Sequence, residues 1–179
     1  MGMAKVSKDF FQNVNVGVAS LLFGVALSIY IYAVSAGKIP STTAWLLFVT
    51  SFLLLLRFWW RHVGLFIRFV PSHTFWQFSF DFLIAFFGIL AVLYVSDTRI
   101  WAAIGAALML ASIIRCALAW KEADKSVQKK LKRTILGALV FLVLAAIIYF
   151  SAPFVSGTIL AGGILVITAL FVMYSARKE

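Results

Sequence analysis

The chain has 179 residues, of which 64% are hydrophobic, with a mean hydropathy of +1.05 and a formal net charge of +10. Soluble domains contain roughly 45–50% apolar residues, and such an excess would expose large apolar patches in water. The apolar residues fall in long runs, which are typical of membrane-spanning helices of about 20 residues. We therefore predict an all-α, polytopic transmembrane bundle that forms one domain over residues 1–179. Six spans leave no room for a separate soluble catalytic domain.

The first apolar run covers residues 13–35 and is too long for the apolar core of a signal peptide, so we expect it to be a span. Gly37, Lys38 and Pro40 then predict a short exposed turn. The remaining predicted spans cover residues 44–60, 75–95, 100–120, 134–151 and 156–174. We expect a loop in the polar stretch 121–133. An aromatic belt at the membrane surfaces is expected from Trp45, Trp76, Trp101 and Trp120, which lie near span ends.

Basic residues are distributed unevenly between the two sides of a six-span arrangement. Outside the spans, twelve of them fall on the side of the two termini, and only Lys38 and Arg99 fall on the other side. Because positive loops are retained in the cytoplasm, both termini are predicted to be cytoplasmic. An odd number of spans would place the two basic ends on opposite sides, so the distribution also favours an even number.

Residues that carry enzyme chemistry are scarce in this sequence. It has two histidines, one cysteine and no Cys-x-x-Cys, His-x-x-x-His, Gly-x-Ser-x-Gly or phosphate-loop motif. We expect no catalytic residues, no metal site and no cofactor, and we interpret Cys116 as a small core residue. The net positive charge is expected to serve membrane topology, so no nucleic-acid partner is predicted.

The first predicted span carries small and polar residues on one side. They recur at intervals of three or four positions, which keeps them on one helical face: Asn13, Gly17, Ser20, Gly24, Ser28, Tyr32 and Ser35. One interpretation is close packing against another helix. The other is a water-facing or pore-facing stripe, in which a ring of Leu21 side chains from an oligomer would close the path by dewetting.

Three charges lie within the predicted spans, all in the leaflet nearer the termini: Arg57, Asp81 and Arg115. A charge at this depth is costly unless it is paired or hydrated. One interpretation is an ion pair between Asp81 and either Arg57 or Arg115. The other is a cation-attracting or gating carboxylate at an inner vestibule.

Small residues also recur on later spans. Alanines occupy every fourth position at Ala103, Ala107 and Ala111, and Gly157 and Ala161 show the same spacing, with Gly162 and Gly163 beside them. We predict helix–helix contacts there, within or between subunits.

The segment that ends the second predicted span contains Trp59, His62 and Phe66, preceded by Ser51-Phe52. It resembles the Trp-x-x-His-His-x-x-Phe pattern of the endosomal/lysosomal-type potassium channel family, which includes six-helix prokaryotic members. Val63 replaces the second histidine, and the family's Arg-x-x-x-Phe-Ser-Asp hallmark is missing from the first helix. The resemblance implies a divergent relative that forms a tetramer with its first helix at the pore.

These observations lead to a functional hypothesis. We expect a multi-pass protein of the plasma membrane that forms a homo-oligomer in the bilayer and conducts a monovalent, potassium-like cation. Asn13, Gly17, Ser20, Leu21, Gly24 and Ser28 are the pore-lining candidates. The alternatives are a non-conducting membrane scaffold or accessory subunit of a larger complex, and a small transporter.

Overall fold

The computed structural model describes residues 3–61, 64 and 75–176, which form six α-helices and no strand. The helices are α1 (Met3–Ser35), α2 (Thr42–Arg61), α3 (Phe75–Leu93), α4 (Thr98–Trp120), α5 (Lys125–Ser151) and α6 (Gly157–Ala176). The predicted all-α class is confirmed. The five helices from α2 to α6 are each long and apolar enough to cross a membrane, and α1 contributes a shorter apolar part, Ser20–Ser35. The chain is thus built as a multi-pass membrane protein.

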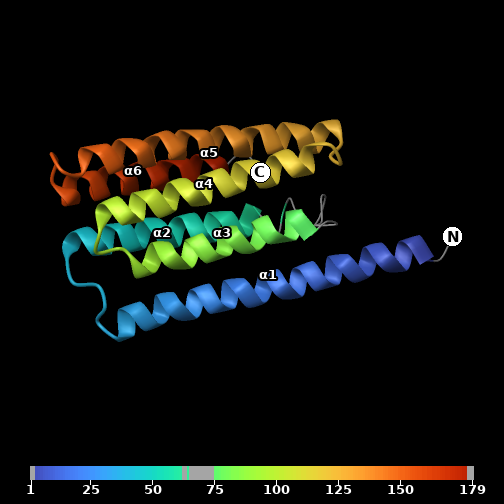
Figure 1. Ribbon diagram of the computed structural model, residues 1–179, viewed down its shortest axis with the longest axis horizontal. Coiled ribbons are helices and arrows are strands. Elements are labelled where there is room, and N and C mark those ends of the chain that lie inside the picture. Colours follow the sequence, from blue (N-terminus) through green and yellow to red (C-terminus); the bar gives the residue numbers. More distant parts are fainter. Residues whose placement is uncertain (1–2, 62–63, 65–74, 177–179) are drawn as a thin grey trace.

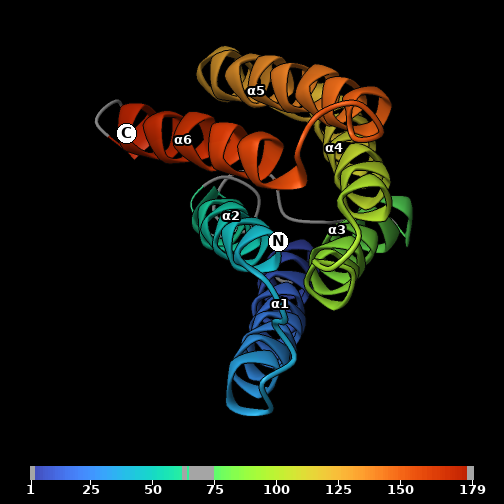
Figure 2. The ribbon, with the colours of Figure 1, turned by 90° about the vertical axis from the view of Figure 1, so that its left-hand side faces the viewer.

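The helices run side by side and reverse direction at each turn (Figure 1). The start of α1, the end of α6 and the α4–α5 turn at residues 121–124 lie at the same end of the bundle, which we call the basic end. The turns at residues 36–41, 94–97 and 152–156 lie at the opposite end. Helices α2 to α6 are grouped together, and α1 lies outside this group against α2 and α3 (Figure 2).

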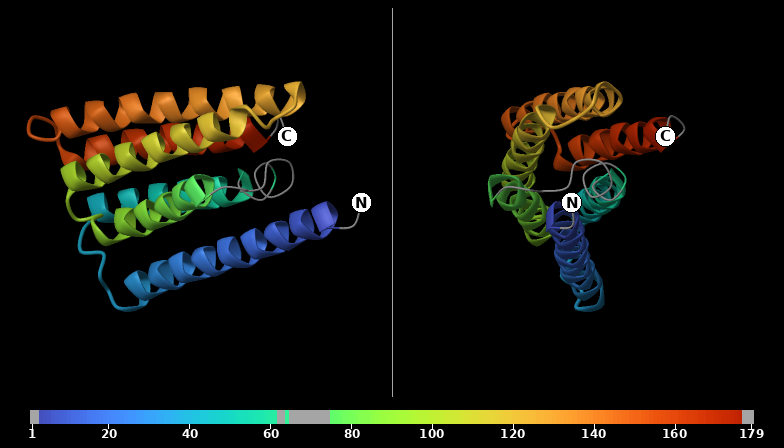
Figure 3. Two further views of the ribbon diagram at one scale, coloured as in Figure 1. Left: turned by 45° about the vertical axis from the view of Figure 1, so that its right-hand side comes forward. Right: turned by 90° about the vertical axis from the view of Figure 1, so that its right-hand side faces the viewer.

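Helix α1 is longer than the predicted first span, because it begins at Met3 and not near Asn13. Its 33 residues correspond to a length of about 50 Å at 1.5 Å per residue, against about 30 Å for the hydrocarbon core of a bilayer. The excess lies at the basic end, where α1 projects past the other helices (Figure 3). This part contains Lys5, Lys8 and Asp9, so the helix continues into a charged segment.

The predicted loop at residues 121–133 is wrong for most of its length. The turn covers only residues 121–124, and α5 begins at Lys125. Asp124 caps this helix, since its side chain accepts hydrogen bonds from the backbone N–H groups of Ser126 and Val127 at 2.8 and 2.9 Å. Val127 and Leu131 are buried against the end of α4, which stabilises the first two turns despite the surrounding lysines.

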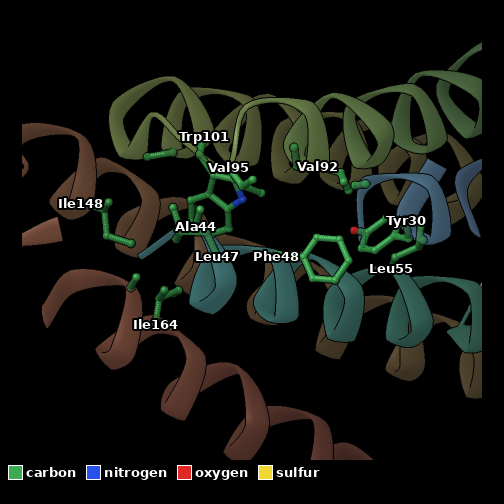
Figure 4. Packing of buried hydrophobic residues seen from close by; sticks show 14 of the residues in the cluster. Tyr30, Ala44, Leu47, Phe48, Leu55, Val92, Val95, Trp101, Ile148 and Ile164 are labelled. Carbon is green, nitrogen blue, oxygen red and sulfur yellow. The ribbon is translucent and has the colours of Figure 1, made fainter. Parts of the chain in front are cut away.

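The main core takes in residues of all six helices, among them Tyr30 of α1 and Val92 of α3 (Figure 4). Leu47 and Ala102 are fully buried there, in the same cluster as Ile148 and Ile164. Ala44 on α2 is also fully buried, and small side chains such as these two alanines allow close helix packing.

Trp101 belongs to this core, and its predicted place in an aromatic belt is wrong. Its side chain is 5% exposed, and its indole Nε1–H donates to Ser51 Oγ at 2.8 Å. An internal acceptor removes the need for the indole to reach the membrane surface. The other three tryptophans of the predicted belt, Trp45, Trp76 and Trp120, are exposed.

Candidate functional site

The small and polar face of α1 points away from the rest of the chain. Gly17, Ser20, Gly24 and Ser28 are exposed, and so are Tyr32 and Ser35 at the end of the helix. A Cβ atom added at Gly17 or Gly24 would meet no neighbour within 4 Å. Leu21 is 67% exposed on the same side of the helix. The described residues of the stripe are therefore exposed, and its glycines have no neighbouring helix within 4 Å of their Cβ positions. The side chain of Asn13 lies outside the part that the structure describes.

The other face of α1 holds the helix to the bundle. Ala26, Tyr30 and Ala33 are buried, and the Tyr30 ring lies 5.1 Å from the ring of Phe48 on α2, measured between centroids. The ring of Phe23 stacks on that of Trp59 at 4.6 Å with an interplanar angle of 21°. These large apolar contacts fix the rotation of α1 about its axis, and that rotation turns the stripe outward.

Two hydroxyl groups of the stripe have hydrogen-bond partners on their own helix. Ser28 Oγ donates to the backbone carbonyl of Gly24 at 2.8 Å, and Ser35 Oγ donates to that of Tyr32 at 3.2 Å. Such bonds satisfy the hydroxyl hydrogen and leave the oxygen able to accept a further hydrogen bond or to contact a cation. The face therefore offers oxygen atoms at regular intervals along an otherwise apolar helix.

Of the three charges within the predicted spans, Asp81 and Arg115 form an ion pair. Arg115 Nε donates to Asp81 Oδ1 at 3.0 Å, and the two side chains are 0% and 12% exposed. The pair joins α4 to α3 in the half of the bundle nearer the basic end. This is the arrangement expected of charges that must be neutralised in an apolar environment. Arg57 is half-buried on α2, one turn before Arg61.

Arg61 makes a long-range contact that the sequence did not reveal. It ends α2, and its Nε and Nη2 donate to Thr134 Oγ1 on α5 at 3.0 and 2.8 Å. Nη2 also donates to the backbone carbonyl of Lys130 at 3.1 Å. Nearby in the fold, Gln77 Nε2 on α3 donates to Glu122 Oε1 in the α4–α5 turn at 3.1 Å. These bonds between elements distant in sequence close the bundle at its basic end.

The residues of the family-like motif are only partly described. Trp59 is half-buried and contacts α1 through Phe23, whereas His62 and Phe66 lie outside the described residues. Ser51, which precedes the motif, accepts the indole hydrogen bond of Trp101. In this chain the described part of the motif thus positions α1 and α4 against α2.

The predicted small-residue contacts divide into two groups. A Cβ at Gly157 would lie 3.2 Å from Thr43 Cγ2, and Ala161 is fully buried, so this face of α6 does pack closely on α2. Thr43 and Thr158 also share a hydrogen bond of 2.7 Å. Gly163 is exposed, by contrast, with nothing within 4 Å of its Cβ position. On α4, Ala111 is buried but Ala103 is exposed.

Within residues 3–61, 64 and 75–176, no three or more His, Cys, Asp or Glu side chains lie together in a group that could hold a metal ion. Cys116 is a buried free thiol that packs with Ala119, Val127 and Leu131. The arrangement best suited to a ligand is therefore the outward face of α1, with its oxygen atoms and its exposed leucine.

Comparison of the chain with protein-family models, curated proteins and solved structures found no match in any of the three.

Proposed function

We propose that this chain forms a cation-conducting homo-oligomer in which the polar face of α1 lines the conduction path. The observation that supports the proposal is the outward position of that face: Gly17, Ser20, Gly24 and Ser28 lie on the side of α1 turned away from the chain's own core. In a bilayer, a single chain would expose this small and polar face to lipid. Neighbouring positions on the same helix are strongly apolar and better suited to that contact.

The physical argument concerns what covers this face. Hydroxyl groups and exposed backbone gain little from contact with lipid tails, whereas they bind water or a second helix well. Symmetric association of several copies would bring the same face of each α1 together around one axis. The serine oxygens and the carbonyls near Gly24 would then line a path for a monovalent cation, with Leu21 as its apolar constriction.

Asp81 has a secondary place in this proposal. Its carboxylate is paired with Arg115, so the negative charge is largely balanced within the chain. Cation preference would then come from the oxygen atoms of α1. A tetramer, cytoplasmic termini and a plasma-membrane location complete the proposal. The tetramer follows from the family resemblance, and the cytoplasmic termini follow from the basic residues at one end of the bundle.

Leu21→Ser and Leu21→Asn test the path directly. Purified protein in liposomes is assayed for potassium, sodium and proton flux, and either variant is expected to change the rate or selectivity because it hydrates the constriction. Leu136→Ser is the matched control, since Leu136 is also a well-exposed leucine (63%, against 67% for Leu21) but lies on α5. Unchanged flux in both Leu21 variants of a conducting protein would rule out this pore assignment.

A non-conducting scaffold or accessory subunit is the second candidate, because the same exposed face could pack against a different membrane protein. Its expected signature is purification with a stoichiometric partner and no flux from the chain alone. Ser28→Cys distinguishes the two, since cross-linking between copies is expected only if the α1 faces meet. The native Cys116 is buried and provides an internal control for non-specific cross-linking.

A further inference from the structure

A groove of about 560 Å³ lies on the side of the bundle near the opposite end, between α3, α4 and α5. Its lining includes Ala103 and Ala107 on α4, which we call its floor, together with Phe87 on α3 and Ile104 on α4. Its volume lies within the range of ligand sites, which is about 300–1,000 Å³. The two alanines lie one turn apart, and their methyl side chains occupy little of the space along the groove.

The groove lining includes a positively charged residue, Arg99, close to the α3–α4 turn, and we call this end of the groove its mouth. Arg99 lies in the first turn of α4, and its guanidinium carbon is 4.8 Å from the centroid of the Tyr149 ring on α5. Among the described residues, Arg99 forms no ion pair. Asp97 also borders the mouth, but its carboxylate accepts the backbone N–H groups of Arg99 and Ile100, both at 2.9 Å. The carboxylate is therefore directed to the start of α4, and the guanidinium remains available to an anion.

The position of this charge relative to the groove is characteristic of a lipid-binding surface. Between Arg99 and Ala107 the helix advances by about 12 Å at 1.5 Å per residue, more than a third of the roughly 30 Å hydrocarbon core. An apolar trough that runs inward from a guanidinium fits a molecule with a long apolar chain and an anionic head. Guanidinium groups bind phosphate oxygens through paired N–H donors.

We propose that this groove binds an anionic phospholipid, with one acyl chain along Ala103 and Ala107 and the phosphate on Arg99. The site is separate from the α1 face, which lies on another side of the bundle (Figure 2). Lipid binding here does not depend on whether the protein conducts ions. The site would fix the depth of α4 and α5 in the leaflet at the opposite end.

The test uses native mass spectrometry of the full chain in detergent, with equal amounts of phosphatidylglycerol and phosphatidylcholine of identical acyl chains. Wild type is expected to retain phosphatidylglycerol preferentially. Arg99→Gln should lower that preference about tenfold, the effect of losing one hydrogen bond to a charged group. Lys38→Gln is the matched control, since Lys38 is exposed at the same end outside the groove. An unchanged preference in Arg99→Gln would overturn the proposal.

A second variant tests the groove itself. Ala103→Leu fills the floor and is expected to reduce retention of phosphatidylglycerol, whereas Ala117→Leu, on an exposed part of α4 beyond the groove, should not. If Ala103→Leu leaves lipid retention intact but changes the oligomeric mass, the groove is a contact between copies and the lipid site is refuted. Equal melting temperatures for Arg99→Gln and wild type would show that any lipid effect does not come from misfolding.

Discussion

Arg115 on α4 donates from Nε to Asp81 Oδ1 on α3 across 3.0 Å, and the arginine side chain is completely buried. The two helices are adjacent in sequence and joined by a short turn at the opposite end of the bundle. The ion pair therefore holds α3 and α4 together in the half of the molecule farther from the turn that connects these helices. A buried charge that loses its partner is strongly destabilising, since neither water nor another charge compensates it.

Replacement of either partner alone is expected to destabilise the fold. Asp81→Ala and Arg115→Ala should each lower the free energy of unfolding by about 3–5 kcal/mol, the usual cost of leaving one buried charge unpaired. The double variant Asp81→Ala/Arg115→Ala should lose less than the sum of the two single losses, because it removes both charges and leaves neither unpaired. Thermal or denaturant unfolding in detergent gives the free energy of unfolding of wild type, the two single variants and the double variant, which together form a double-mutant cycle. Losses that simply add would show that the pair is not coupled.

Ser51→Ala is expected to destabilise the protein more than Ser112→Ala. Both serines are buried, but only Ser51 accepts the Trp101 indole N–H, while Ser112 Oγ donates to the Leu108 carbonyl of its own helix. A buried N–H left without an acceptor costs about 1–3 kcal/mol, whereas loss of the Ser112 hydroxyl leaves no donor unsatisfied. Unfolding midpoints of the two variants give the comparison, and equal midpoints would contradict the assigned role of Ser51.

Asp124 should make the stability of α5 depend on pH. Hydrogen bonds from the backbone N–H of Val127, and then from Ser126, lower the pKa of its carboxyl group below the ordinary value. The cap therefore contributes stability above the unfolded pKa of about 3.9, and that contribution is lost as the pH falls through the lower folded pKa. Asp124→Ala is expected to melt below wild type at pH 7, with the difference closing below about pH 4.

Asp124→Asn is the control for that prediction. Asparagine is also a favourable N-cap residue but does not titrate, so this variant should melt close to wild type at pH 7. Melting temperatures are compared from pH 7 to pH 3. A gap between wild type and Asp124→Ala that stays constant over this range would contradict a role for the ionised carboxylate.

Two glycines of α6 are expected to respond differently to alanine. Gly163→Ala places a methyl group in open space and should stabilise the helix by about 0.5–1 kcal/mol through its propensity. Gly157→Ala places a Cβ 3.2 Å from Thr43 Cγ2 and 3.3 Å from Thr98 Oγ1, so the neighbouring helices must move slightly. Gly163→Ala should therefore give the higher melting temperature, and the reverse order would refute the α2–α6 contact at Gly157.

The sequence predicts the positions of the helices well, because each depends on local composition. Long apolar runs separated by polar turns cover most of α2, α3, α4 and α6 within a few residues. Gly37 is a clear example of local control, since its φ of 62° is readily adopted only by a residue without a side chain. The start of α5 differs from the sequence prediction, because the many lysines in this segment predict a solvated loop. The helical signal there is weaker and consists of the four-residue spacing of Val127 and Leu131.

Relations between helices depend on geometry that local composition does not contain. From the sequence, either Arg57 or Arg115 could form the ion pair with Asp81. The packing of α3 beside α4 selects Arg115. Trp101 has the sequence position of an interfacial residue, yet the rotation of α4 turns it toward Ser51. The stripe on α1 was visible as a helical face, but the direction of that face depends on where Phe23 and Tyr30 pack.

The sequence by itself therefore determined an apolar, all-α chain with several membrane-length helices and an uneven distribution of positive charge. Each of these properties depends only on the composition of neighbouring residues along the chain. Only the tertiary structure decided which faces meet, which charges pair and which face of α1 is left uncovered. Those properties follow from contacts between residues far apart in the chain, where a rotation of one helix by a fraction of a turn exchanges a buried face for an exposed one.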